Sequence, residues 1–162
     1  MFVGEYKGLN SVEKKIIKDN NPSNRFQAIR GVDNSKIFKR IRKPNTTIYE
    51  EVVHFSNTDK KLRHKFYTLK ETKNANKYVE EGDVLISRVG RNAGMVTIPT
   101  QEFEGKLASD YFFIYKGLSL SENQVKIIQE ELFLQKRGLT TSYLTKSDIN
   151  DVLLKQTQNV FY

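Results

Sequence analysis

The chain of 162 residues contains no cysteine and only two histidines. Without cysteine it can form no disulfide framework, no cysteine zinc site and no thiol chemistry, and this absence suits a reducing cytoplasm. Neither His54 nor His64 has a second histidine at metal-ligand spacing, so nothing in the sequence points to a metal site. We therefore expect no metal ion and no cofactor.

Long apolar runs are also absent. No segment approaches the roughly 18 consecutive apolar residues that a membrane-crossing helix needs. The N-terminal sequence MFVGEYKGLN lacks the basic-then-apolar layout of a secretory signal. We expect a cytoplasmic protein that is independent of membranes. The chain has no internal repeat, low-complexity tract or Pro/Gly/Ser-rich linker, which predicts one domain over residues 1–162.

Motifs of catalysis are sparse. The sequence has no G-x-S-x-G elbow, no G-x-x-x-x-G-K-[ST] phosphate loop and no methyltransferase motif, and Gly90–Gly94 is too short to cradle a nucleotide. Asp83 followed by Glu104-Gly105-Lys106 has the D…E-x-K order of Mg²⁺-dependent nucleases. The same residues also fit a turn after Gly82 and a solvated hairpin tip. We favour a non-catalytic protein, with a small nuclease as one alternative.

Positive charge is unevenly distributed. The chain has 27 Lys and Arg against 19 Asp and Glu, a formal net charge of +8. Residues 1–80 hold 18 basic and 9 acidic residues, whereas residues 81–162 hold 9 and 10. The surplus is densest in KIFKRIRKP (36–44) and KKLRHK (60–65), where aromatic residues lie within or near the basic runs. Such a pattern favours a polyanionic partner, although a solvated basic face is the simpler interpretation.

The apolar patterns predict short strands followed by helices. Strands are expected at 25–31, 46–55, 64–69, 83–89, 95–98 and 109–115. Segments 83–89 and 95–98 should pair as a hairpin across the Gly90–Gly94 loop. We expect an α+β fold, a single domain with a twisted, mainly antiparallel sheet and a few helices.

Two helices are expected after the strands. Ser121 and Gln124 fit a capping box at the start of the first helix, whose apolar residues follow at helical spacing. Gly138 stands where a C-terminal glycine cap belongs. A short second helix should run from Thr145 or Ser147 through Asp151.

Four motifs resemble, in order and approximate spacing, the target recognition domain of type I restriction–modification specificity (S) subunits and related single-chain restriction–methylation enzymes. They are FQAIRGVD (26–33), GDVLISRVG (82–90), GMVTI with ASD (94–98 and 108–110), and GLTTSYLTKSDI (138–149). The resemblance covers residues 25–154. The chain departs from such subunits in having one domain, no long spacer helix, and VLLKQT (152–157) in place of the usual closing I-x-[IV]-P-x-P.

The resemblance implies a module that recognises a specific sequence in duplex DNA. Its implied partners are an adenine methyltransferase subunit or domain and, in some systems, a restriction or translocase subunit. An excised domain, a half-size subunit that forms a homodimer, and a cousin used elsewhere all remain open. An RNA-binding or protein-interaction domain is the other alternative, because charge alone does not select duplex DNA.

Candidate DNA contacts come from the basic runs and from two loops. Arg suits bidentate contact to guanine, and side chains beside the Gly90–Gly94 turn could reach outward. The polar segment after the first helix is the second candidate loop. The DNA-binding candidates are Arg40, Arg42, Lys43, Lys60, Lys61, Arg63, Arg88, Arg91, Lys136, Arg137, Thr141 and Tyr143. For each arginine, a surface charge without a partner is the alternative.

Overall fold

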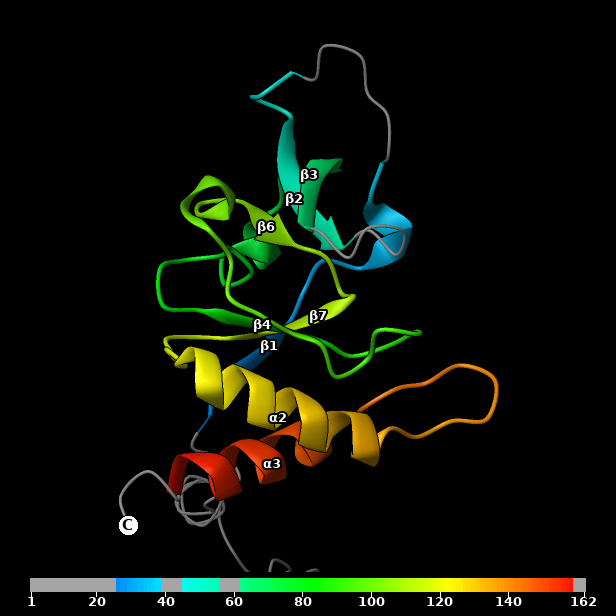
Figure 1. The fold of residues 1–162 in the computed structure, drawn as a ribbon. Coiled ribbons are helices and arrows are strands. Elements are labelled where there is room, and N and C mark those ends of the chain that lie inside the picture. Colours follow the sequence, from blue (N-terminus) through cyan, green and yellow to red (C-terminus); the bar gives the residue numbers. More distant parts are fainter. Residues whose placement is uncertain (1–25, 39–44, 56–61, 159–162) are drawn as a thin grey trace, which may run out of the picture.

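The computed structural model describes residues 26–38, 45–55 and 62–158, which form three layers (Figure 1). Two helices cover one face of a four-stranded sheet, and a three-stranded sheet lies on its other side. The strands are β1 (Ala28–Arg30), β2 (Tyr49–Phe55), β3 (Leu62–Leu69), β4 (Val84–Ser87), β5 (Val96–Thr97), β6 (Leu107–Ala108) and β7 (Phe112–Tyr115). The helices are α2 (Glu122–Gln135) and α3 (Lys146–Gln158).

The strands confirm the expected mainly antiparallel α+β fold, but they divide into two sheets rather than one. The first sheet has the order β1-β7-β4-β5, and every neighbouring pair is antiparallel. The second has the order β3-β2-β6, in which β2 pairs with β3 antiparallel and with β6 parallel. The short strand β6 was not expected from the sequence, because two residues carry no recognisable alternation.

The central strands β4 and β7 are buried on both faces. Val84 and Ile86 face the helices, whereas Leu85 belongs to the apolar cluster on the opposite face. This division follows from the two-residue period of a strand. The helices supply Ile128, Leu132, Ile149, Val152 and Leu153 to the first cluster. The two apolar faces of one sheet therefore hold the three layers together.

The start of α2 is as expected from its sequence, and its end is not. Gln124 N donates to Ser121 Oγ at 3.2 Å and Ser121 N donates to Gln124 Oε1 at 2.9 Å, which completes the capping box. The helix ends at Gln135, so Gly138 is not its cap. Gly138 instead lies in the hairpin that follows, with a φ of +95°.

Helix α3 is longer than expected. The predicted helix stops at Asp151, but α3 continues to Gln158 because the buried Val152 and Leu153 pack onto the first sheet. The Tyr115 hydroxyl donates to Asn150 Oδ1 at 2.8 Å, which fixes the helix to β7. Within the described residues, no helix is both long and apolar enough to cross a membrane.

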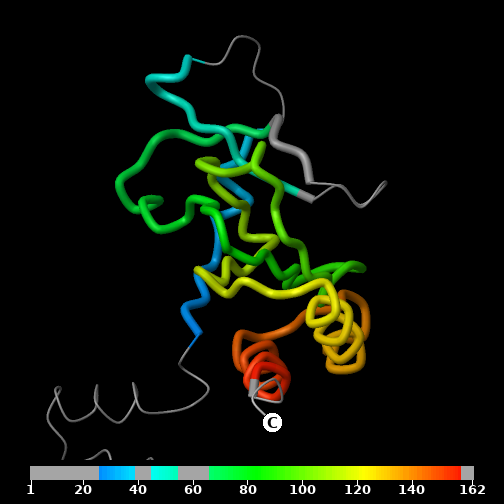
Figure 2. The backbone as a smooth tube through the Cα atoms, turned by 60° about the vertical axis from the view of Figure 1, so that its left-hand side comes forward, coloured from blue at the N-terminus to red at the C-terminus, as the bar shows by residue number. Residues whose placement is uncertain are grey.

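The two sheets are joined where residues 31–32 cross residues 108–110. Val32 N donates to Ala108 O at 2.8 Å, and Asp110 N donates to Val32 O at 2.8 Å. A Cβ atom on Gly31 would lie 2.1 Å from the Ser109 carbonyl oxygen, so only glycine fits this crossing. In Figure 2 the blue segment runs from the level of the helices up to the second sheet.

Candidate nucleic-acid interface

The two loops singled out in the sequence lie side by side. Gly90 N donates to Ser142 O at 2.8 Å, and Leu144 N donates to Arg88 O at 2.9 Å. Val89 and Tyr143 form an isolated antiparallel bridge between these bonds. Figure 1 shows the green β4–β5 turn and the orange segment after α2 projecting from the same side of the molecule. We call residues 88–94 and 136–143 the paired loops.

The second of the paired loops is a small hairpin. Arg137 and Tyr143 exchange two backbone hydrogen bonds of 2.9 Å. A Cβ on Gly138 would lie 2.1 Å from Thr141 O, and its positive φ is one that L side chains rarely adopt. Leu139 at the tip is fully exposed. The hairpin is thus a defined structure held by its own backbone, although its side chains face solvent.

Arg137 holds the base of this hairpin to α3. Its Nε and Nη2 donate to the two carboxylate oxygens of Asp148, each at 2.8 Å. The same carboxylate accepts from Thr145 N at 3.1 Å, and Asp148 N donates to Thr145 Oγ1 at 3.1 Å. These contacts occupy one edge of the Arg137 guanidinium, so its expected DNA contact would compete with an internal ion pair.

Replacement of Asp148 by asparagine should lower the free energy of unfolding at neutral pH. It should also make that free energy fall less as the pH is lowered. The hydrogen bond from Arg137 lowers the pKa of Asp148 from 3.8 to about 2. Because the folded pKa is depressed, the stabilisation is present above pH 4 and is lost as the pH falls towards 2. Asp148→Asn should cost about 1 kcal/mol at neutral pH, since Arg137 is more than half exposed and solvent weakens the pair.

Urea denaturation at pH 7 and at several pH values down to 2 measures this effect. Asp151→Asn is the matched control, because Asp151 is an exposed carboxylate on the same helix. If Asp148→Asn and Asp151→Asn have equal midpoints at pH 7, the ion pair does not stabilise the hairpin base.

Lys136 joins the first loop to the end of α2. Its Nζ donates to Arg91 O at 2.9 Å and lies 4.4 Å from the centroid of the Phe133 ring. Burial lowers the pKa of Lys136 below its ordinary value. Gly94 contributes to the same junction, since a Cβ there would lie 3.1 Å from Leu132 Cβ. The ammonium of Lys136 therefore has a structural partner as well as access to solvent.

Arg88 differs most from its expected orientation. Its side chain is only 17% exposed and turns inward, where Nε donates to the Asp110 carbonyl oxygen. Its Nη2 lies 3.8 Å from Asp110 Oδ2. Burial lowers the pKa of Arg88 from its ordinary value, with the nearby Arg30 acting in the same direction. The prediction that this side chain reaches outward is wrong because Asp110, remote in sequence, binds it.

Four of the predicted residues in the paired loops are exposed. They are Arg91, Arg137, Thr141 and Tyr143. Within the described part of the chain, no hydrogen bond or ion pair engages the Arg91 guanidinium. Arg40, Arg42, Lys43, Lys60 and Lys61 lie outside the described residues. Arg63 belongs to β3, and its side chain is likewise not described.

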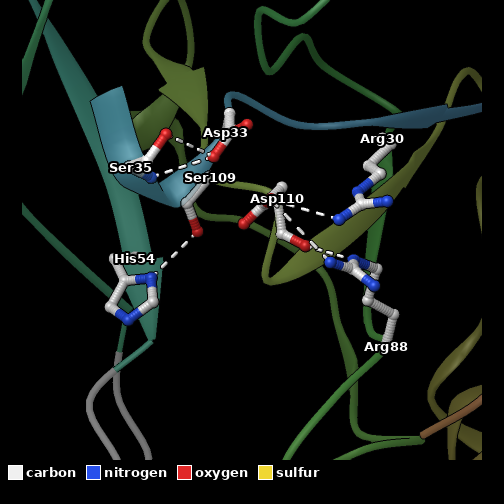
Figure 3. Close-up of polar contacts among 7 residues, drawn as sticks. All are labelled: Arg30, Asp33, Ser35, His54, Arg88, Ser109 and Asp110. Carbon is white, nitrogen blue, oxygen red and sulfur yellow. Dashed lines mark hydrogen bonds and ion pairs between the residues drawn. The ribbon is translucent and has the colours of Figure 1, made fainter. Parts of the chain in front are cut away.

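Arg30 is a basic residue that the sequence argument did not select. It ends β1 directly before Gly31, and its side chain is 58% exposed. Its Nη2 donates to Asp110 Oδ2 at 3.3 Å, so Arg30 and Arg88 approach one carboxylate from two strands' ends (Figure 3). The available signal was an arginine close before a glycine at a strand end, since Gly31 directly follows Arg30 and Gly90 lies two residues after Arg88.

Two residues of the D…E-x-K pattern, Asp83 and Lys106, have structural partners. Asp83 is buried, and its carboxylate accepts from Glu80 N at 2.9 Å, from Gly117 N at 2.9 Å and from the Lys116 ammonium. Lys106 Nζ donates to Glu102 O at 2.8 Å and lies 3.3 Å from Glu51 Oε2. Among the described residues, no three His, Asp or Glu side chains gather where a metal ion could be held.

His54 and Ser109 form a further polar contact near the crossing of the sheets. The two side chains lie 2.9 Å apart at Nδ1 and Oγ (Figure 3). The His54 ring packs edge-on against Phe66 and Tyr111, with centroids 5.2 and 5.3 Å away. Ser109 is completely buried, so its hydroxyl is not accessible to a substrate and the contact links β2 to the crossing.

No protein-family model matches the chain, and no curated protein matches it either. A function for the chain therefore rests on the resemblance of its sequence motifs and on the arrangement of its own residues.

Proposed function

We propose that the chain is a sequence-specific duplex DNA recognition module of a restriction–modification or related DNA-modification system. It would direct a partner methyltransferase or nuclease, with an adenine methyltransferase the first candidate, to its site. The observation that carries this proposal is the pairing of the two loops through Gly90–Ser142 and Arg88–Leu144 backbone hydrogen bonds. Two segments chosen from the sequence as independent candidates thereby form one surface.

The form of the paired loops suits a DNA groove. The major groove of B-DNA is about 12 Å wide and admits a two-stranded ribbon. The Arg137–Tyr143 hairpin is a smaller projection, closed by one antiparallel bridge, and its neighbour carries the exposed Arg91. Internal contacts of Arg137 and Lys136 fix the backbone before any ligand binds. A preformed hairpin loses less conformational entropy on binding than a mobile loop would.

The hairpin also offers groups that hydrogen-bond to bases and phosphates. Thr140, Thr141 and Ser142 are consecutive hydroxyl residues, and Thr140 and Thr141 are exposed. Hydroxyls accept and donate, so they can bond to either kind of partner. The net charge of +8 adds a sequence-independent attraction to the DNA backbone. Residues that contact phosphates would then orient the module on the DNA, and other residues that contact base edges would select the sequence.

Binding to duplex DNA should be steeply salt-dependent. Counterion release makes the logarithm of the association constant fall linearly with the logarithm of salt concentration. Fluorescence anisotropy with a randomised duplex pool, at several salt concentrations, measures the slope. Duplex RNA serves as competitor. A flat dependence on salt, or stronger competition by RNA than by DNA, would contradict the proposal.

Arg91→Ala should cost about 1–3 kcal/mol on the preferred sequence and relax the preference at one position, if Arg91 reads a base edge. Lys126→Ala is the control for loss of one positive charge. Lys126 is exposed in the N-terminal half of α2, whereas the C-terminal end of that helix leads into the paired loops. Selection from a random duplex library compares the variants. An Arg91→Ala protein with the full preference of the wild type would exclude Arg91 as a reader.

A further inference from the structure

The Asp110 carboxylate lies between two guanidinium groups beside the paired loops. Arg30 Nη2 is 3.3 Å from Asp110 Oδ2, and Arg88 Nη2 is 3.8 Å from the same oxygen. Figure 3 shows both arginines directed at this residue. The backbone of Arg88 also accepts from Leu144 N, which continues the hydrogen bonds of the paired loops to this group. The three residues carry a net charge of +1.

Asp110 is held firmly in this position. Its N donates to Val32 O at 2.8 Å, and its carbonyl oxygen accepts from Arg88 Nε. It directly follows Ser109, against which Gly31 is tightly packed. The Asp110 side chain is 12% exposed. A fixed carboxylate of this kind can orient an arginine whose own stem is free to move.

Arg30 and Arg88 differ in what they can still bind. Arg88 is 17% exposed; its Nε donates to the Asp110 carbonyl oxygen, and its Nη2 forms an ion pair with the carboxylate at 3.8 Å. Arg30 is 58% exposed, and within the described residues its side chain has one hydrogen bond, from Nη2 to Asp110. A guanidinium has five N–H donors in a planar fork. Arg30 therefore presents further donors to solvent in an orientation that Asp110 restricts.

We propose that Arg30 reads a guanine in duplex DNA and that Asp110 is its positioning residue, an inference that rests on the proposed function. Guanine offers two acceptors, O6 and N7, on its major-groove edge, and arginine matches both. The base edge is uncharged, so the Asp110 carboxylate does not oppose it. A phosphate approaching Arg30 would meet the charge of that carboxylate. The Arg30–Asp110 pair thus favours a base over the DNA backbone.

The test uses the sequence selected by the full chain from a random duplex library. Each guanine in turn is replaced by 7-deazaguanine, which lacks the N7 acceptor. At one position the replacement should weaken wild-type binding about tenfold. Arg30→Ala should bind the natural and modified duplexes equally. Arg30→Lys should also lose the discrimination while retaining the charge, because an ammonium cannot bond to both acceptors.

Asp110→Asn tests whether the carboxylate positions Arg30, which would itself contact the guanine. Loss of the carboxylate charge should reduce discrimination against 7-deazaguanine and increase binding to unrelated duplexes. Thermal unfolding of each variant confirms that it is folded. Asp110 also contacts Arg88, so Asp110→Asn could unfold the chain. In that case Arg30→Lys, which changes an exposed side chain, still tests the inference.

Three outcomes overturn the inference. If Arg30→Ala weakens all sequences alike and reduces the salt slope by about one, Arg30 contacts a phosphate. If Arg30→Ala and Arg30→Lys keep the full discrimination, another residue reads that guanine, while the proposed DNA-recognition function stands. If the wild-type chain binds no duplex DNA, both the proposed function and this inference fail.

Discussion

Asp83→Ala is expected to lower the free energy of unfolding by about 3–5 kcal/mol, because it removes one partner of a buried ion pair. The Asp83 carboxylate is 2% exposed and binds two backbone amides together with the Lys116 ammonium. Without it, the amides of Glu80 and Gly117 lose their acceptor. Since a domain of this size has about 5–15 kcal/mol of stability in total, the variant should be close to unfolding at 37 °C.

Guanidinium chloride denaturation at 25 °C measures the loss. Asp83→Asn is the graded control, because it keeps an oxygen acceptor and the side-chain volume but not the charge that binds Lys116. Its loss should be smaller than that of Asp83→Ala. An Asp83→Ala protein as stable as the wild type would show that this carboxylate has no structural role.

Another residue of the D…E-x-K pattern, Glu104, separates the DNA-recognition proposal from the nuclease alternative. We expect the purified wild-type chain neither to cut nor to methylate DNA when Mg²⁺ or S-adenosylmethionine is supplied. Mg²⁺-dependent cleavage that disappears in a folded Glu104→Ala variant would contradict this expectation and favour the D…E-x-K interpretation. Glu104 suits that test because it is not buried, so its replacement should leave the fold intact.

Gly31→Ala is expected to destabilise the chain by about 3 kcal/mol, through overpacking at the crossing of the two sheets. The added Cβ would lie 2.1 Å from Ser109 O and 2.4 Å from Ala108 O. Both atoms are backbone, so neither can move aside as a side chain would. Relief requires residues 31–32 and 108–110 to separate, which would weaken the hydrogen bonds between Val32 and the opposite segment.

Gly105→Ala is the matched control for Gly31→Ala. Gly105 has a φ of +80°, but a Cβ there would meet nothing within 4 Å. Its replacement should cost about 1 kcal/mol, from backbone strain alone. Denaturation midpoints of the two variants make the comparison. Equal losses would mean that the crossing relaxes to admit a methyl group.

Features encoded by short sequence signals were predictable from the sequence. The capping box of Ser121 and Gln124 is formed by residues three apart, so its two hydrogen bonds need no distant partner. The β4–β5 hairpin likewise follows from two apolar runs bounded by Gly90 and Gly94. The mainly antiparallel α+β fold follows from a series of such local signals.

Three features were misread or missed, and two of them, strand β6 and the end of helix α3, depend on a distant contact. Gly138 looks like a helix cap in sequence, but the close approach of Thr141 O requires it in a hairpin. Strand β6 has two residues and exists because β2 pairs with it in parallel. Helix α3 extends past Asp151 because burial of Val152 and Leu153 stabilises residues that have no terminal signal of their own.

The sequence by itself identified both loops of the candidate interface, because glycine, arginine and hydroxyl residues mark them locally. Only the tertiary structure decided that these loops pair, since the Gly90–Ser142 hydrogen bond joins segments far apart in the chain. It also decided which arginines have an internal partner. Arg88 turns inward to Asp110 and Arg137 binds Asp148, whereas Arg91 stays in solvent. An arginine's orientation depends on the carboxylate that folding brings beside it, and sequence spacing does not reveal that partner.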